Sequence, residues 1–121
     1  MCLRIVKDEK PRIAKKDILC YKVISSCGDG TYQTYYQLTD VVIGETYKSK
    51  VIVRPNGTTI GVGLHSYSNK KALFQFNYDL LSDPIRGVKC IIPKGSTYYV
   101  GDFCGDRSYA SDQLTYVKII R

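Results

Sequence analysis

The side chain best suited to chemistry in this chain is its single histidine, His65, in the stretch Gly63-Leu64-His65-Ser66-Tyr67. Side chains alternate between the two faces of a strand, so a strand here would point His65 and Tyr67 to the same side. An imidazole beside a phenol can bind phosphate, hold a ribose hydroxyl or transfer a proton near neutral pH. The same residues also fit a histidine that is hydrogen-bonded for structural reasons alone, and both interpretations stay open from the sequence.

A second group of polar and aromatic residues lies in 93–99, PKGSTYY. Lys94 supplies a cation in a turn beside a glycine, and Tyr98 or Tyr99 can stack on a base. Lys22, much earlier in the chain, adds a second cation for a phosphate group. Together with the histidine, these residues indicate a nucleotide site. A turn followed by a half-buried strand also explains the pattern of 93–99.

The cysteines indicate neither a metal site nor a disulfide framework, because no two of them form a C-x-x-C pair and there is one histidine. We therefore expect no bound metal, no cofactor and a reducing, cytoplasmic location. No apolar run approaches the roughly 18 residues of a membrane span, and the first residues carry no apolar signal segment, so no membrane partner is expected. The cysteines are Cys2, Cys20, Cys27, Cys90 and Cys104.

The formal net charge of +7 favours polyanionic partners such as nucleic acid or nucleotides, although a solvated basic surface explains it as well. Basic residues interleaved with Tyr32, Tyr35 and Tyr36 suit single-stranded nucleic acid in a generic way, through phosphate pairing and base stacking. Much of the excess charge falls early in the chain, in Arg4, Lys7, Lys10, Arg12, Lys15, Lys16 and Lys22.

The elements that would position these residues are mostly strands, rich in β-branched and aromatic residues and separated by turn residues. One helix is predicted over about residues 69–81, capped by Ser68 or Asn69 and ended by Pro84. Residues 101–106 are expected to form a loop. The predicted strands are 18–24, 31–38, 41–43, 50–54, 59–67, 88–92, 97–100 and 113–120, with turns at 55–57 and 93–96.

This pattern predicts an α+β fold of mainly antiparallel strands with one principal helix. Residues 1–17, polar and interrupted by Pro11, are expected to form a basic N-terminal arm. Residues 18–121 would then form a single α+β domain, a size that buries a core without cross-links.

Several stretches resemble a family of small uncharacterised proteins from gut bacteria and their tailed phages. The resemblance covers about residues 18–120, and it suggests a phage protein acting in the host cytosol. The stretches that carry it are 21–24 (YKVI), 43–47 (IGETY), 63–67 (GLHSY), the helix containing Ala72, 88–95 (VKCIIPKG) and 109–114 (YASDQL).

A more distant resemblance is to the ADP-ribosyltransferase fold. Residues 63–67 and the following helix are similar to that superfamily's middle strand and helix, where an aromatic residue stacks on the nicotinamide side of NAD. Residues 109–119 are similar to the strand that carries its catalytic glutamate, and Asp112 is the acid found there. The missing glutamate favours a binder that kept the groove over an active transferase.

The leading hypothesis is therefore a non-enzymatic binding protein for an anionic nucleotide or an NAD-derived molecule, which in a phage setting would sequester a host immune signal. The first alternative is an atypical ADP-ribosyltransferase or nucleotide-cleaving enzyme that uses Asp112 and His65. The second is a nucleic-acid- or protein-binding inhibitor of a host defence enzyme, acting through the basic arm. The expected ligand-binding residues are His65, Tyr67, Tyr98, Tyr99, Lys22 and Lys94.

Overall fold

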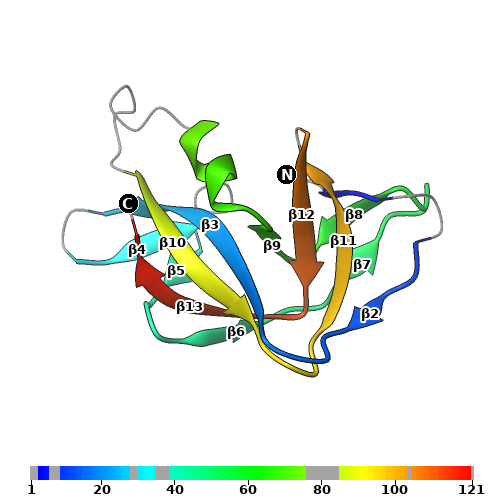
Figure 1. Cartoon of the computed structure of the whole chain (residues 1–121), viewed down its shortest axis with the longest axis horizontal. Helices are drawn as coiled ribbons and strands as arrows, with labels where there is room; N and C mark the ends of the chain where they lie inside the picture. The colour runs from blue at the N-terminus through cyan, green and yellow to red at the C-terminus, as the bar shows by residue number, and fades with distance from the viewer. Residues whose placement is uncertain are drawn as a thin grey trace.

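The chain folds into an antiparallel β-sheet that curls on itself (Figure 1). The computed structural model describes residues 3–5, 9–27, 30–34, 39–75, 85–103 and 105–120. In this part of the chain the strands are β1 (Leu3–Arg4), β2 (Arg12–Ile13), β3 (Ile18–Ser26), β4 (Tyr32–Thr34), β5 (Asp40–Val41), β6 (Thr46–Lys48), β7 (Ile52–Val53), β8 (Thr59–Val62), β9 (Leu64–Tyr67), β10 (Ile85–Ile92), β11 (Thr97–Phe103), β12 (Asp106–Ser111) and β13 (Gln113–Ile119).

The strand order runs β6-β13-β10-β3-β9-β12-β11-β1-β8-β7, with β2 added to β11 and the β4–β5 pair added to β3. Strands β3 and β9 are in register at one position, Tyr21 opposite Tyr67. The sheet therefore divides at this junction into two halves, which Figure 1 shows on opposite sides of the molecule. The short helix η1 (Lys70–Gln75) directly follows β9.

Alternation along the strands sorts apolar side chains into three buried clusters. The first contains much of β3, β10 and β13, including Ile24, Val88 and Leu114. The second packs Val23 and Tyr67 against Ala72 and Leu73 of η1. The third lies in the other half of the sheet, where Leu3, Ile5 and Ile60 meet Ala110.

The expectation of an α+β fold with a principal helix at 69–81 is wrong. Residues 70–75 form a 3₁₀ helix, the described part of the chain contains no α-helix, and 76–81 lies outside it. Asn69 does cap the start, because its Oδ1 accepts the N–H of Lys71 at 2.8 Å and its carbonyl accepts that of Ala72 at 3.1 Å. Two lysines and no acid in the first turn oppose the helix dipole, and packing of Ala72 and Leu73 on the sheet fixes the short turn. The distant resemblance to the ADP-ribosyltransferase fold stays a prediction.

Strand boundaries also differ from expectation in two places. The predicted 101–106 loop is largely strand, since β11 runs to Phe103 and β12 begins at Asp106. The predicted strand 59–67 is divided into β8 and β9 at Gly63, whose φ of 152° is unusual for other residues. A polar strand such as β12 has no apolar alternation to indicate it, but its buried Ser108 and Ser111 hydroxyls donate to the carbonyls of Asp106 and Leu64.

The N-terminal segment belongs to the sheet. Strand β1 lies between β11 and β8, and β2 pairs with the start of β11. Leu3, Ile5 and Ala14 are buried. In the described residues, no helix is long and apolar enough to cross a membrane.

Candidate functional site

His65 lies in β9 and is buried, with 7% of its surface exposed. Its Nδ1 is 3.1 Å from the Gly63 carbonyl, so Nδ1 carries the proton and donates it. Its Nε2 has no hydrogen-bond partner among the described residues. Burial, and next the charge of Lys22, lower the pKa of His65 to about 4. The imidazole is therefore neutral at physiological pH and is enclosed by the protein.

The Lys22 side chain contacts the backbone of His65. Its Nζ donates to the His65 carbonyl oxygen at 2.9 Å. Strands β3 and β9 are in register only at Tyr21 and Tyr67, so the lysine supplies a hydrogen bond where the two strands separate. Burial lowers the pKa of Lys22. Lys22 thus holds the sheet together at its junction, which explains this cation without a ligand.

The three tyrosines predicted to bind the ligand are buried to different degrees. Tyr67 is buried in the second cluster, with its ring centroid 6.1 Å from that of Phe103. Tyr98 is half-buried and meets Tyr109 edge to face at 5.9 Å. Tyr99 packs on the third cluster beside Ala110. Their rings pack in the hydrophobic core or at its edge.

Lys94 and Asp112 lie at the ends of strands. Lys94 is exposed in the β10–β11 turn, and its N–H donates to Asp17 Oδ1 at 2.9 Å. The Asp112 carboxylate accepts the N–H of Thr97 at 3.0 Å. Its own N–H donates to the Thr97 carbonyl at 3.0 Å, and its carbonyl accepts the N–H of Ser49. The described residues show no hydrogen bond between Asp112 and His65.

The structure therefore brings together two of the predicted ligand-binding residues, the partly buried Lys22 and the buried His65. A different set of residues surrounds an open pocket of about 420 Å³. These are Arg4, Ile5, Glu9, Arg12, Val100, Gly101 and Asp102.

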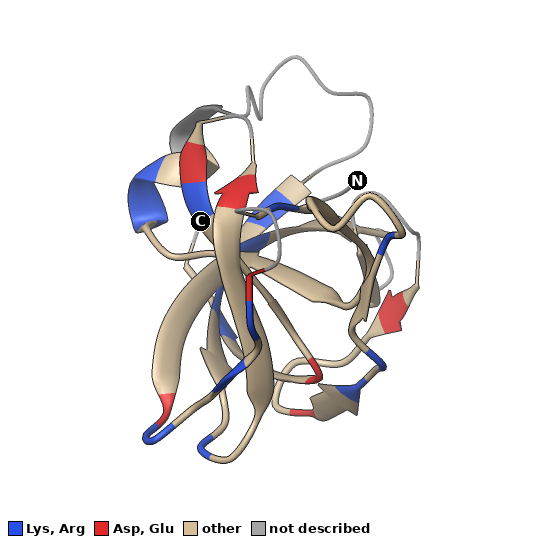
Figure 2. Ribbon diagram, turned by 90° about the vertical axis from the view of Figure 1, so that its right-hand side faces the viewer, with Lys and Arg blue, Asp and Glu red and all other residues tan. Residues whose placement is uncertain are grey.

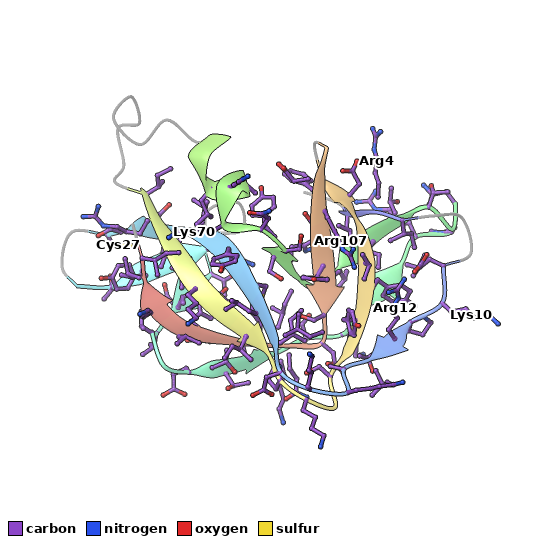
Figure 3. All side chains as sticks on the ribbon, in the orientation of Figure 1. Arg4, Lys10, Arg12, Cys27, Lys70 and Arg107 are labelled. Atoms are coloured by element: carbon purple, nitrogen blue, oxygen red, sulfur yellow. The ribbon has the colours of Figure 1, made fainter. Side chains whose placement is uncertain are left out.

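Two pairings on one edge of β11 create this pocket. Strand β1 pairs with β11 at Asp102, and β2 pairs with it at Thr97 and Tyr98. The pocket lies between the two pairings, beside Val100 and Gly101. Figure 3 shows the labelled side chains of Arg4 and Arg12 on the side of the molecule where β11 lies, and both line the pocket.

The pocket contains charges of both signs. Arg12 pairs with Glu9 at 3.3 Å, and about half of the Arg12 side chain stays exposed. The Arg4 side chain is exposed and makes no hydrogen bond or ion pair with the described residues. Asp102, the register partner of Arg4, is also exposed. An incoming ligand thus meets two accessible guanidinium groups and two carboxylates.

A separate basic cluster forms where the N-terminal segment meets the β10–β11 turn. The Ala14 N–H donates to the Ser96 carbonyl at 2.9 Å, and the Gly95 N–H donates to the Ala14 carbonyl at 2.8 Å. These bonds bring exposed Lys15 and Lys16 beside the turn of Lys94. Figure 2 shows that Lys and Arg also occur on other sides of the molecule, so the charge of +7 is not confined to one face.

Sequence reasoning missed the pocket, although it counted Arg4 and Arg12 among the basic residues. No local signal joins residue 4 to residue 102, because the two meet only through sheet pairing.

Within the described residues, no three His, Cys, Asp or Glu side chains are grouped closely enough to hold a metal ion. No protein family, no curated protein and no solved structure shows a match to this chain.

Proposed function

We propose that this chain is a non-enzymatic binding protein for an anionic nucleotide, and that its site is the pocket of Arg4 and Arg12. The observation that carries the proposal is that two accessible arginines and two carboxylates line one opening. The site thus differs from the one that the sequence predicted around His65 and Tyr67, which are both buried.

The mixed charge of the pocket suits a ligand that carries both phosphate and hydroxyl groups. A guanidinium donates two parallel hydrogen bonds to a phosphate, which makes Arg4 and Arg12 suited to that part of the ligand. Carboxylates accept hydrogen bonds, so Glu9 and Asp102 are suited to ribose hydroxyls. Inorganic phosphate would contact only the two arginines.

The size of the pocket agrees with a ligand of this class. Its volume of about 420 Å³ falls within the range of roughly 300–1,000 Å³ that is usual for small-molecule sites. The alternative of an enzyme using Asp112 and His65 has no comparable support. The Asp112 carboxylate is engaged by the backbone of Thr97, and the imidazole is enclosed.

Isothermal titration of the full chain with ADP-ribose, AMP, ribose 5-phosphate and inorganic phosphate tests the proposal. We expect the three sugar phosphates to bind and inorganic phosphate to bind much more weakly. Arg4→Gln and Arg12→Gln should each weaken binding by about tenfold or more, since each removes a charge-assisted contact. Lys70→Gln is the matched control, because it removes an exposed charge on η1, which Figure 3 shows on the other side of the molecule from the labelled Arg4 and Arg12. The proposal fails if none of the compounds binds at millimolar concentration, or if the arginine variants bind like the control.

A second candidate, nucleic-acid binding, is favoured by the cluster of Lys15, Lys16 and Lys94. In this case a single-stranded oligonucleotide would bind more tightly than any mononucleotide, with an affinity that falls steeply with salt. Binding would be lost when the three lysines are replaced by glutamine and retained in Arg4→Gln. Fluorescence anisotropy at several salt concentrations separates the two candidates.

A further inference from the structure

Two of the cysteines lie directly opposite each other on neighbouring strands. Cys20 in β3 and Cys90 in β10 are register partners in an antiparallel pair. Their side chains therefore point to the same face of the sheet, and both are fully buried in the first apolar cluster. Both are free thiols. The sequence separates them by most of the chain, so only the fold creates this pair.

The geometry of such a pair is close to that of a disulfide. Opposite residues in antiparallel strands have Cα atoms about 4.5–5.5 Å apart. Disulfides span Cα separations of about 4.4–6.8 Å. On the other side of β10, the register with β13 shifts between Lys89 and Cys90, which marks a bulge where the backbone departs from regular pairing. Small adjustments at Cys90 are therefore compatible with the sheet.

A cationic group lies near both thiols. The charge of Lys22 acts on Cys20 and on Cys90, and in each case it favours the thiolate. Burial outweighs this effect and raises the pKa of Cys20 to about 11. Burial also raises the pKa of Cys90. Both groups are thus neutral thiols in the closed sheet, and we expect them to react faster when local unfolding exposes them.

We propose that Cys20 and Cys90 are a redox-modification site, at which a small-molecule disulfide of the glutathione class converts the two thiols to a cross-strand disulfide. This inference is independent of the nucleotide pocket. In the first step the Cys20 thiolate attacks one sulfur of glutathione disulfide, the S–S bond breaks, and glutathione leaves as a thiolate that takes up a proton. In the second step the Cys90 thiolate attacks Cys20 Sγ of the mixed disulfide, and the second glutathione leaves in the same way. The two cysteines lose two electrons and two protons, and one glutathione disulfide becomes two glutathione thiols.

The test uses the full chain with Cys2, Cys27 and Cys104 replaced by serine, so that only the pair remains. This protein is incubated with excess glutathione disulfide at pH 8, with and without urea below its unfolding range. Remaining thiols are then alkylated, and the intact mass is measured. We expect a product that has lost two hydrogen masses, takes up no alkylating agent and returns to the starting mass with dithiothreitol. Urea should accelerate its formation.

Two further measurements keep the test decisive. The oxidised protein should keep the circular dichroism spectrum of the reduced one, and its Tm should rise by about 5–10 °C because the cross-link restricts the unfolded chain. Cys20→Ser and Cys90→Ser, made in the same background, should yield no such product. The proposal is overturned if both thiols remain alkylatable after long exposure, if the pair carries glutathione instead of an internal bond, or if the oxidised protein loses its native spectrum.

Discussion

Lys22 and His65 show how polar residues are accommodated inside this sheet. The Lys22 ammonium group donates a hydrogen bond to the backbone carbonyl of His65, at the point where β3 and β9 separate. His65 keeps one ring nitrogen bonded to Gly63 and leaves the other without a partner among the described residues. A second positive charge here would be buried near the first one. The histidine is therefore constrained to be neutral.

This neutrality predicts a pH dependence of stability. The pKa of His65 is about 4 in the folded protein and near 6.5 when unfolded. Between these values the unfolded chain binds a proton that the folded chain does not, so stability falls as the pH decreases from 6.5 to 4. The full effect is about 3 kcal/mol. Urea unfolding of the wild type and of His65→Gln between pH 4 and 8 measures it.

The difference between the two proteins isolates the histidine, because carboxylates that titrate at low pH affect both. We expect the variant to gain stability relative to the wild type as the pH falls below 6.5. A difference in unfolding free energy that stays constant over the whole range would mean that His65 is accessible to protons in the folded state.

Strand β1 is the element that completes the candidate pocket. It contributes Arg4 to the pocket, and it is inserted between β11 and β8 through Leu3 and Arg4. Its close approach to β11 depends on Gly101, where a Cβ atom would overlap the Arg4 carbonyl oxygen and lie 2.9 Å from Leu3 Cγ. Both the pocket and the packing of β1 therefore depend on a glycine at position 101.

Gly101→Ala should displace β1 and destabilise the protein by about 3 kcal/mol, because the overlap is with backbone and cannot be relieved by a side-chain rotation. Nucleotide binding should weaken with it, since Arg4 moves. The matched control is Gly61→Ala, whose Cβ would come within 2.7 Å of Arg54 Nε, on an exposed side chain that can move away. Its cost should stay below about 1 kcal/mol. Chemical denaturation compares the two, and equal effects would contradict this account of β1.

The molecule as a whole is held together by strands that are far apart in the sequence. The N-terminal segment pairs with β8 and β11, and β3 pairs with β10. The residues expected to form a basic arm thus complete one half of the sheet. Lys10, Lys15 and Lys16 are exposed, whereas Leu3, Ile5 and Ala14 are buried in the core.

Deletion of residues 1–16 should consequently abolish cooperative unfolding or lower the Tm by more than about 10 °C. Burial of Leu3 and Ile5 alone contributes about 4 kcal/mol, a large part of the 5–15 kcal/mol that is typical of a domain. Thermal unfolding followed by circular dichroism measures this. Replacing Lys10, Lys15 and Lys16 by glutamine removes charge and keeps the strands, so this variant should melt near the wild-type temperature. A deletion variant that melted like the wild type would show that the two N-terminal strands do not support the fold.

The sequence by itself determined the local features of this protein. Alternation and β-branched residues indicated strands at 18–24, 88–92 and 113–120, and turn residues indicated breaks at 55–57 and 93–96. These features depend on neighbouring residues, as the Asn56 side chain shows by accepting the N–H of Thr58 at 2.9 Å. Asn69 was likewise recognisable as a cap.

Only the tertiary structure decided which residues meet. It enclosed His65 and Tyr67, and it placed Arg4 opposite Asp102 and Cys20 opposite Cys90. It also gave residues 70–75 a 3₁₀ conformation, packed against the sheet. The physical reason is that strand pairing and core packing act between segments that are distant in the chain, whereas propensity and alternation report only on neighbours. The candidate site is made from such distant pairings, so it could be found only after the sheet was assembled.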